Sequence, residues 1–313
     1  MHLLILIILY VFSTVITAQA QPPQTPSRTI TLVTHSSPGG GSDVLLREMV
    51  KHLAPIMNVD FVVRNVKGGS GARAIAYVAT SDPTGETLYA TTPTYINVSL
   101  LSKPRLTFED LEPLVNIVLD PQVLYTRSDS PYTNLKEVIA AGRSDPQRQR
   151  WGIGNPASLD RQIVADLARL TELDMIVASH DGGGELLLNV LNGSVEFGIG
   201  ELQELLGNLH GGKIKLLATF SSERLPQTPK VPTAREQGFD IEVAKFRGLA
   251  APHGLPAGII QDWNTAIPAL LAVPAFRGFL DRTGLIAGFI PHDDYVSYIG
   301  RFANQQRALM LNH

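Results

Sequence analysis

The chain has 313 residues, of which 44% are hydrophobic and 18% are charged, a composition typical of one or two globular domains and not of a disordered chain. The net charge is −3 and no long basic run occurs, so the sequence offers no electrostatic footprint for a nucleic acid. The chain holds no cysteine, which excludes disulfide bonds, an acyl-cysteine anchor, a cysteine nucleophile and thiolate metal sites.

The first 20 residues are typical of a secretory signal peptide. An apolar run over residues 3–11 precedes the small-residue cleavage site Ala18-Gln19-Ala20. The segment before the run holds only His2 and no lysine or arginine, so the true start codon lies either here or upstream. The alternative is an N-terminal membrane anchor, for which the run is short. We therefore expect residues 1–20 to be removed on export and the mature protein to be free in the periplasm.

The rest of the chain alternates short apolar runs with amphipathic stretches, which predicts parallel βαβ units and an α/β fold with two sheets. The predicted strands are residues 29–34, 61–66, 87–91, 123–126, 151–154, 175–179, 197–199 and 214–219. The predicted helices are residues 42–53, a helix ending at 79, and residues 134–141, 160–173 and 185–191. We expect the last sixty residues to be mainly helical, with breaks at Pro268, Pro274 and Pro291.

Four glycine-rich turns follow predicted strands, at residues 36–43, 67–71, 152–158 and 180–184. Glycine lets the backbone approach a ligand closely with its N–H groups exposed, and the start of a helix favours an anion. One such turn alone would equally be a plain strand–helix connection. Because ligands of open α/β sheets bind at the carboxyl ends of the strands, the four turns together predict one crevice that binds an anion.

Two of these turns also match the G-x-G-x-x-A pattern, at residues 69–74 and 152–157. A dinucleotide site needs a carboxylate at the end of the next strand. The strand after the first turn ends in Thr92-Pro93-Thr94, and Asp174 precedes the strand after the second. The common motifs of zinc proteases, serine hydrolases and P-loop enzymes are missing, and the histidines lack metal-ligand spacing. The sequence therefore predicts no enzyme activity, no cofactor and no metal site.

The order of short motifs resembles the Bug/TctC family, the periplasmic receptors of tripartite tricarboxylate transporters. Residues 34–43 look like the first binding loop of that family, and residues 65–74 are similar to its Asn-x-x-Gly-x-x-Gly loop. Further similar segments are residues 82–88, 180–183, 209–215, 231–238, 246–248 and 251–256. The resemblance covers nearly the whole mature chain.

The resemblance implies a type II periplasmic-binding-protein fold, with two α/β domains and a ligand cleft between them. One domain would combine residues 28–124 with residues 245–313, and the other would contain residues 125–244. A ligand carboxylate would lie between the first loop and the loop before Asp160, held largely by backbone N–H groups and waters. The candidate ligand-binding residues are Ser36, Ser37, Gly39, Gly40, Gly41, Ser42, Asp43, Thr92, Asn155, Ser158, Leu159, Asp160, Gln162, His180, Asp181, Glu201 and Arg247.

The chain departs from the family pattern in its charges. Ser36 stands where the family has an aromatic residue, and an Asp160–Arg161 pair is added to the loop before the predicted helix. Asp181 and Glu201 add negative charge, the first of them where the family often has lysine. An unpaired buried carboxylate is costly. Therefore either these groups face water, or Arg247 or Arg73 pairs with them, or the ligand carries a cationic or hydroxyl group.

The function that the resemblance implies is a monomeric binding protein that captures a small organic acid and delivers it to the membrane subunits of a transporter. Mono-, di- and tricarboxylates, amino acids and aromatic acids all fit this class. A receptor that docks on a sensor kinase is an alternative that the sequence does not separate from transport. A cleft enzyme that uses His35 or His180 with a nearby carboxylate is a third hypothesis.

Overall fold

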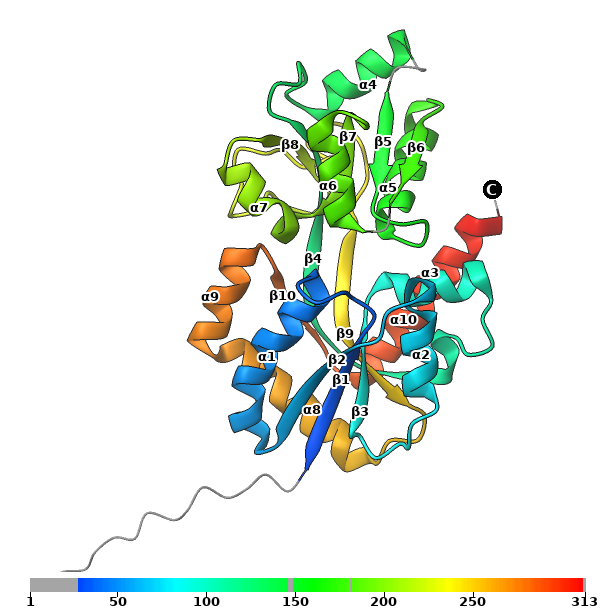
Figure 1. Cartoon of the computed structure of the whole chain (residues 1–313), viewed down its shortest axis with the longest axis vertical. Coiled ribbons are helices and arrows are strands. Elements are labelled where there is room, and N and C mark those ends of the chain that lie inside the picture. Colours follow the sequence, from blue (N-terminus) through cyan, green and yellow to red (C-terminus); the bar gives the residue numbers. More distant parts are fainter. Residues whose placement is uncertain (1–27, 146–148, 181, 312–313) are drawn as a thin grey trace, which may run out of the picture.

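The computed structural model describes residues 28–145, 149–180 and 182–311, and it has two lobes of mixed α/β structure (Figure 1). The predicted signal peptide, residues 1–20, lies outside the described residues. Two long strands, β4 (Leu111–Arg127) and β9 (Ala244–Pro252), run from one lobe toward the other. The predicted α/β class is confirmed, and the arrangement places a space between the lobes where loops from both can meet.

The lower lobe is built from both ends of the chain. Its strands are β1 (Thr29–Thr34), β2 (Asp60–Asn65), β3 (Thr87–Thr91) and β10 (Ile286–Ile290). Its helices are α1 (Gly41–Met57), α2 (Ala72–Ala79), α3 (Pro93–Ser102), α8 (Ala257–Ala272), α9 (Pro274–Thr283) and α10 (His292–Leu311).

The upper lobe is built from the middle of the chain. Its strands are β5 (Arg150–Ile153), β6 (Ile176–Ser179), β7 (Phe197–Glu201) and β8 (Ile214–Thr219). Its helices are α4 (Leu135–Ser144), α5 (Leu159–Thr171), α6 (Gly183–Asn192) and α7 (Leu202–His210).

The predicted parallel pairing holds within each lobe but not between the long strands and their neighbours. β1 pairs in parallel with β2 and β3, and β5 pairs in parallel with β6 and β7. β4 and β9 are antiparallel to every strand they pair with. β4 pairs with β9 up to Pro121 and with β7 from Gln122 onward, so this strand joins the two predicted sheets into one continuous ladder.

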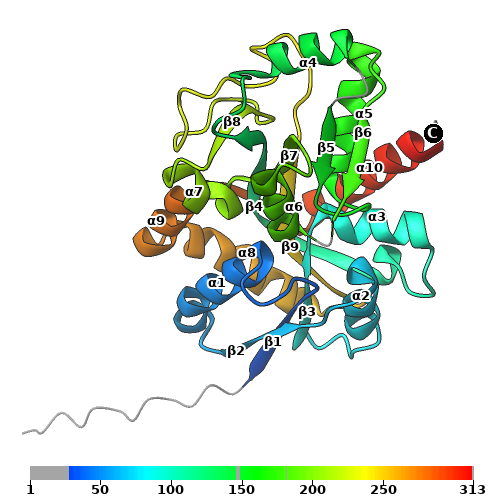
Figure 2. The ribbon, with the colours of Figure 1, turned by 45° about the horizontal axis from the view of Figure 1, so that its top comes forward.

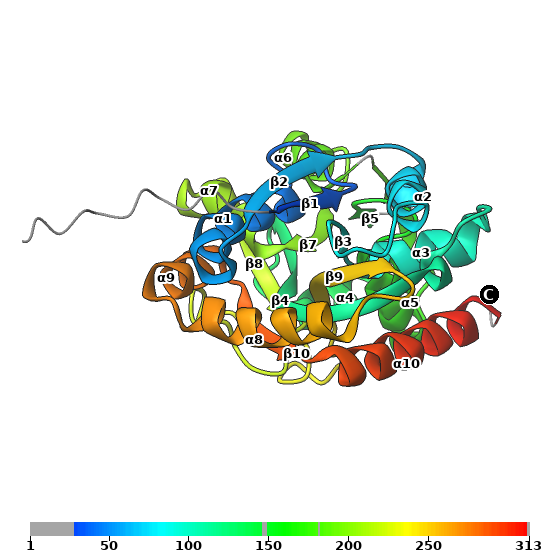
Figure 3. The same ribbon diagram turned by 90° about the horizontal axis from the view of Figure 1, so that it is seen from below.

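Alternate residues of the strands face opposite sides of each sheet, and helices cover both sides. In β3, Leu88 and Ala90 belong to the core under α1, α8 and α9, whereas Tyr89 belongs to the core under α2, α3 and α10. Figure 3 shows these two groups of helices on either side of the lower lobe. In the upper lobe, Leu124 packs with α4 and α5, while Val123 packs with α6 and α7. Both sheets are thus buried on both faces, and their strand ends are left to form a site.

The predicted elements agree best where a strand is short and bounded by turns. The strands predicted at residues 29–34, 87–91 and 214–219 coincide with β1, β3 and β8. Other elements were not predicted: α3, α7, β9, β10 and most of β4. The predicted breaks at Pro274 and Pro291 are confirmed, because α9 begins at the first and α10 follows the second.

The predicted break at Pro268 is wrong, because this residue lies inside α8. Proline removes one hydrogen bond from a helix. Trp263, Ile267 and Leu270 on the same helix are buried in the core with α1, and this packing holds α8 continuous despite the loss. Within the described ranges, none of the helices combines the length and apolar character needed to cross a membrane.

Candidate ligand-binding site

A cavity of about 670 Å³ lies between the two lobes. The structure brings all four glycine-rich turns to its wall, together with the ends of β7 and the first residues of α7 and β9. In Figures 1 and 2 the loop that leads into α1 faces α6 of the upper lobe. The candidate residues that line this cavity are Ser36, Ser37, Gly40, Asn155, Ser158, Asp160 and Glu201.

Asp43 holds the first loop in shape. Its carboxylate accepts hydrogen bonds from the backbone N–H of Gly39 at 2.8 Å, from Nε of Arg47 at 3.0 Å and from Nδ2 of Asn65 at 2.9 Å. Asn65 also donates to the backbone carbonyl of Ser36 at 2.9 Å. Burial acts to raise the pKa of Asp43, but these hydrogen bonds hold it below its usual value. Asp43 therefore remains ionised and positions the loop, and its side chain does not line the cavity.

A buried ion pair closes the floor behind the cavity. Nη2 and Nε of Arg247 lie 2.5 and 2.8 Å from Oδ2 of Asp120, and Gln203 donates to the same oxygen at 3.1 Å. Nη1 of Arg247 donates to Oγ of Ser42 at 2.7 Å. Gly41 has no room for a side chain, since a Cβ there would lie 2.5 Å from Nε2 of Gln203 and 2.7 Å from Nη2 of Arg247. The start of α1 is thus fixed against both long strands and α7.

The cation that pairs with Glu201 is Lys245, not Arg247 or Arg73 as we considered from the sequence. Both side chains are largely buried, at 10% and 18% exposed. Burial acts to raise the pKa of Glu201, but Lys245 and Arg247 lower it to about 2. Glu201 is therefore an ionised wall residue whose charge is balanced within the protein.

Asp160 occupies the first turn of α5 and is only 5% exposed. Its Oδ2 accepts hydrogen bonds from the backbone N–H of Gly154 at 2.8 Å and from Oγ of Ser158 at 3.0 Å. Burial and the charge of Glu201 raise the pKa of Asp160 to about 6, against these hydrogen bonds. A carboxylate of the protein itself therefore accepts the backbone N–H of Gly154 in the loop before α5, where we expected part of a ligand carboxylate to bind.

Glu204 and His35 line the cavity and are both shifted toward their neutral forms. Burial and then Glu201 raise the pKa of Glu204 to about 7. Within the described residues Glu204 has no hydrogen-bond or ion-pair partner, and its carboxylate lies against Gly183 at the start of α6. Burial, Lys245 and then Arg247 lower the pKa of His35 to about 4, and its Nδ1 lies 3.1 Å from Oη of Tyr89.

Other candidate residues are not part of the cavity wall. Those that do not line it are Gly39, Gly41, Ser42, Asp43, Thr92, Leu159, Gln162, His180 and Arg247. Thr92 and Leu159 are buried at the starts of α3 and α5. Nδ1 of His180 lies 3.1 Å from the carbonyl oxygen of Ile153. Asp181 lies outside the described residues.

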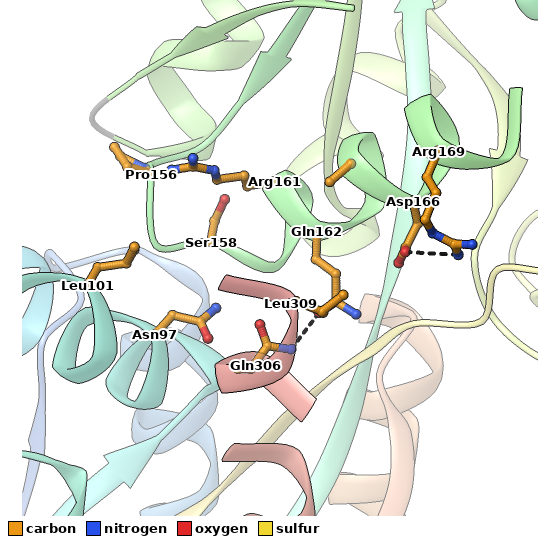
Figure 4. Close-up of a pocket in the computed structure, with 11 residues that line it drawn as sticks. Asn97, Leu101, Pro156, Ser158, Arg161, Gln162, Asp166, Arg169, Gln306 and Leu309 are labelled. Carbon is orange, nitrogen blue, oxygen red and sulfur yellow. Dashed lines mark hydrogen bonds and ion pairs between the residues drawn. The ribbon is translucent and has the colours of Figure 1, made fainter. Parts of the chain in front are cut away.

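Gln162 faces a second, smaller pocket of about 270 Å³ between α5 and the lower-lobe helices α3 and α10 (Figure 4). Its Oε1 accepts a hydrogen bond from Nε2 of Gln306 at 2.7 Å. Beside it, Nδ2 of Asn97 donates to the carbonyl oxygen of Ala157 at 2.9 Å. These contacts join the two lobes on the side of α5 opposite the cavity, so Gln162 contributes to lobe contact in this structure.

Four charged residues of the cavity wall were not among the candidate residues: Lys67, Glu185, Glu204 and Lys245. Lys245 stands two residues before Arg247 on β9, and alternate residues of a strand point to the same side. The two-residue spacing of Lys245 and Arg247 could have indicated that both side chains lie on one face of a strand, but β9 was not among the predicted strands. Glu204 lies in the first turn of α7 and was missed because that helix was not predicted.

Glu204 generates a prediction about stability and pH. Folding raises the pKa of Glu204 from 4.5 to about 7, so its carboxyl group is harder to ionise in the folded protein than in the unfolded chain. The free energy of unfolding therefore falls as the pH rises from about 4.5 to about 7. Asp120 and Glu201 add to this loss of stability, and Lys245 and Arg247 reduce it. Glu204→Gln should therefore raise the Tm of the ligand-free protein by roughly 2–6 °C at pH 8 and leave it nearly unchanged near pH 4.5.

The measurement is differential scanning calorimetry at the two pH values, with Glu86→Gln as the control at an exposed position. The control should leave the Tm unchanged at both. An equal shift of the Glu204→Gln protein at both pH values, or a lower Tm at pH 8, would contradict the proposed cost of ionisation.

Comparison with known proteins identifies the architecture. Residues 45–312 match the model of the tripartite tricarboxylate transporter family receptor, TctC. The chain is 27% identical to protein BugT of Bordetella pertussis over 285 residues, which cover 88% of this chain and 87% of that protein. It is similar to the crystal structure of a TctC solute-binding protein from Polaromonas without ligand, at 26% identity, with a TM-score of 0.74 over 92% of this chain and 99% of the other.

The chain is also similar to MatC from Rhodopseudomonas palustris with bound malate, at 25% identity, with a TM-score of 0.76 over 90% of this chain and 97% of the other. These matches confirm the predicted periplasmic-binding fold and the Bug/TctC resemblance. The chain belongs to the family of receptors of tripartite tricarboxylate transporters.

Proposed function

We propose that this solute-binding receptor captures a small organic acid in the cavity between its lobes and delivers it to the membrane subunits of a tripartite tricarboxylate transporter. The observation that supports this most is the loop over residues 36–40, which leads into the start of α1 at the cavity wall. Exposed backbone N–H groups and the positive end of a helix favour a carboxylate. MatC, a structural relative, binds malate.

The charges near this loop also favour an anion. Lys67 lies at the cavity wall on the loop after β2, whereas the charge of Lys245 is balanced by Glu201. Asp43 stabilises the loop from behind, where its carboxylate is held by Arg47 and Asn65 and does not oppose the ligand. The lower wall is therefore the place for the ligand carboxylate.

We also propose that the protein is exported through residues 1–20, acts as a monomer in the periplasm and does not transform its ligand. Its two domains would be residues 28–124 with 245–313, and residues 125–244. The switch of β4 from β9 to β7 at Pro121 and Gln122 supports a boundary in this region. The lobes would then close by a hinge motion about β4 and β9, and this motion would cover and uncover the cavity.

A ligand that binds only the folded protein stabilises it and raises its Tm. At a ligand concentration of one hundred times the Kd, the free energy of unfolding increases by about 2.7 kcal/mol. A thermal-shift screen of mono-, di- and tricarboxylates, amino acids and aromatic acids should therefore find at least one compound that raises the Tm by roughly 4 °C or more. Isothermal titration calorimetry on that compound then gives its Kd. If no acid raises the Tm, the proposed capture of an organic acid is contradicted.

A matched pair of substitutions tests whether binding occurs in this cavity. Gly41→Ala places a Cβ against Gln203 and Arg247 at the cavity floor, so it should weaken binding at least about tenfold, or ~1.4 kcal/mol. Gly258→Ala makes the same change near the start of α8, where a Cβ meets no atom within 4 Å, and it should leave the Kd unchanged. Equal affinities of the two variants would place the ligand elsewhere.

A further inference from the structure

We propose that the upper wall of the cavity binds a protonated amine, so that the ligand is a small zwitterion with its carboxylate on the lower wall and its ammonium group on the upper wall. This inference rests on the proposed function and specifies the class of acid. It is carried by Asp160 and Glu204, two carboxylates at the cavity wall that form no ion pair with any cation of the described residues.

The cations near the cavity are assigned to other carboxylates. Arg247 pairs with Asp120 at 2.5 Å, and Lys245 pairs with Glu201. On the lower wall, Lys67 is exposed on the loop opposite and His35 is neutral at neutral pH. Each buried cation is thus matched by one buried anion. Asp160 and Glu204 are left facing the cavity without an ion-pair partner among the described residues.

Asp160 is the stronger observation, because it is 95% buried and still opens to the cavity. Both of its protein hydrogen bonds, from Gly154 and Ser158, reach Oδ2. Oδ1 accepts no hydrogen bond from the described residues. Asp160 lines the cavity, and an N–H donor with positive charge forms the strongest hydrogen bonds with a carboxylate oxygen.

Glu204 extends the same surface toward α7. Its carboxylate lies against the α-carbon of Gly183, and this close approach leaves no space for a side chain there. The neighbouring Glu201 is already paired with Lys245 and repels a second negative charge in its vicinity. A ligand ammonium between Asp160 and Glu204 would attract both groups, whereas a second ligand carboxylate at this wall would face like charges on both sides.

Two other kinds of cation fit the wall less well. The side chains of the described residues contain no cluster of three or more histidine, aspartate or glutamate groups arranged to hold a metal ion. A quaternary ammonium group is usually recognised by the faces of aromatic rings, and the described cavity lining contains the His35 imidazole but no phenylalanine, tyrosine or tryptophan. A primary or secondary ammonium, which donates N–H bonds to carboxylates, fits the residues present.

The test compares ligands that differ only at one end. For spacers of two, three and four methylenes, isothermal titration calorimetry measures the Kd of the ω-amino acid, the dicarboxylate and the plain monocarboxylate. Succinate, glutarate and adipate are also compared with their α-amino derivatives. We expect the tightest ω-amino acid to bind at least tenfold more tightly than both the monocarboxylate and the dicarboxylate with the same spacer.

Substitutions then assign the preference to the upper wall. Asp160→Asn keeps an oxygen that accepts from Gly154 and Ser158 but removes the charge. Glu204→Gln also removes a charge, and the side chain it changes has no hydrogen-bond partner among the described residues. Each should weaken the amino-acid ligand at least tenfold and change the monocarboxylate less than twofold. The matched control is Glu86→Gln, at an exposed position outside the cavity, which should change neither.

The outcomes separate this inference from the proposed function. If a dicarboxylate binds more tightly than every amino-acid counterpart, the receptor function stands and the ammonium site is overturned. If the amino acid binds best but both substitutions leave its Kd unchanged, the site is likewise overturned, because the preference arises elsewhere. If no member of any series binds, the capture of an organic acid fails together with it. The wild-type ligand comparison is decisive even where one variant does not fold.

Discussion

The buried ion pair between Arg247 and Asp120 is the interaction on which the site depends. It joins β9 to β4, the two strands that run between the lobes, and through Ser42 and Gln203 it also holds the start of α1 and α7. Removing one partner of a buried pair leaves an unbalanced charge, which costs more than the pair contributes. Lys245 lies two residues from Arg247 on β9, so the pairing of Arg247 with Asp120 also positions Lys245 next to Glu201.

This arrangement divides the cavity by charge. The lower wall presents the loop before α1, and Asp43 supports that loop from behind. The upper wall presents carboxylates, and one of them, Asp160, accepts the backbone N–H of Gly154 in the loop before α5. The starts of α1, α5 and α6 all contribute residues to the cavity wall, and at α5 one of these residues is the carboxylate of Asp160. We therefore propose that Asp160 and Glu201, two of the charged residues by which this chain departs from the family pattern, help to determine which ligand it binds.

The sequence predicted the parallel strands and the glycine turns because those signals are local. β4 was largely missed because Pro113 and Pro121 argue against a central strand, and the structure accommodates Pro113 at a register shift. α3 was missed because its first seven residues are all buried, which leaves no amphipathic pattern. The pairing of Asp120 with Arg247 joins residues that are distant in the chain. No local sequence pattern encodes that contact, so the ion-pair partner of each charged site residue could be identified only from the structure.

The most direct test of this account is a crystal structure of the protein with the ammonium-bearing acid that binds most tightly. The account predicts that the ligand carboxylate accepts hydrogen bonds from backbone N–H groups of residues 36–41. It also predicts that the ligand nitrogen lies within about 3.2 Å of a carboxylate oxygen of Asp160 or Glu204. A ligand bound in the opposite orientation, or one whose nitrogen contacts neither carboxylate, would contradict it.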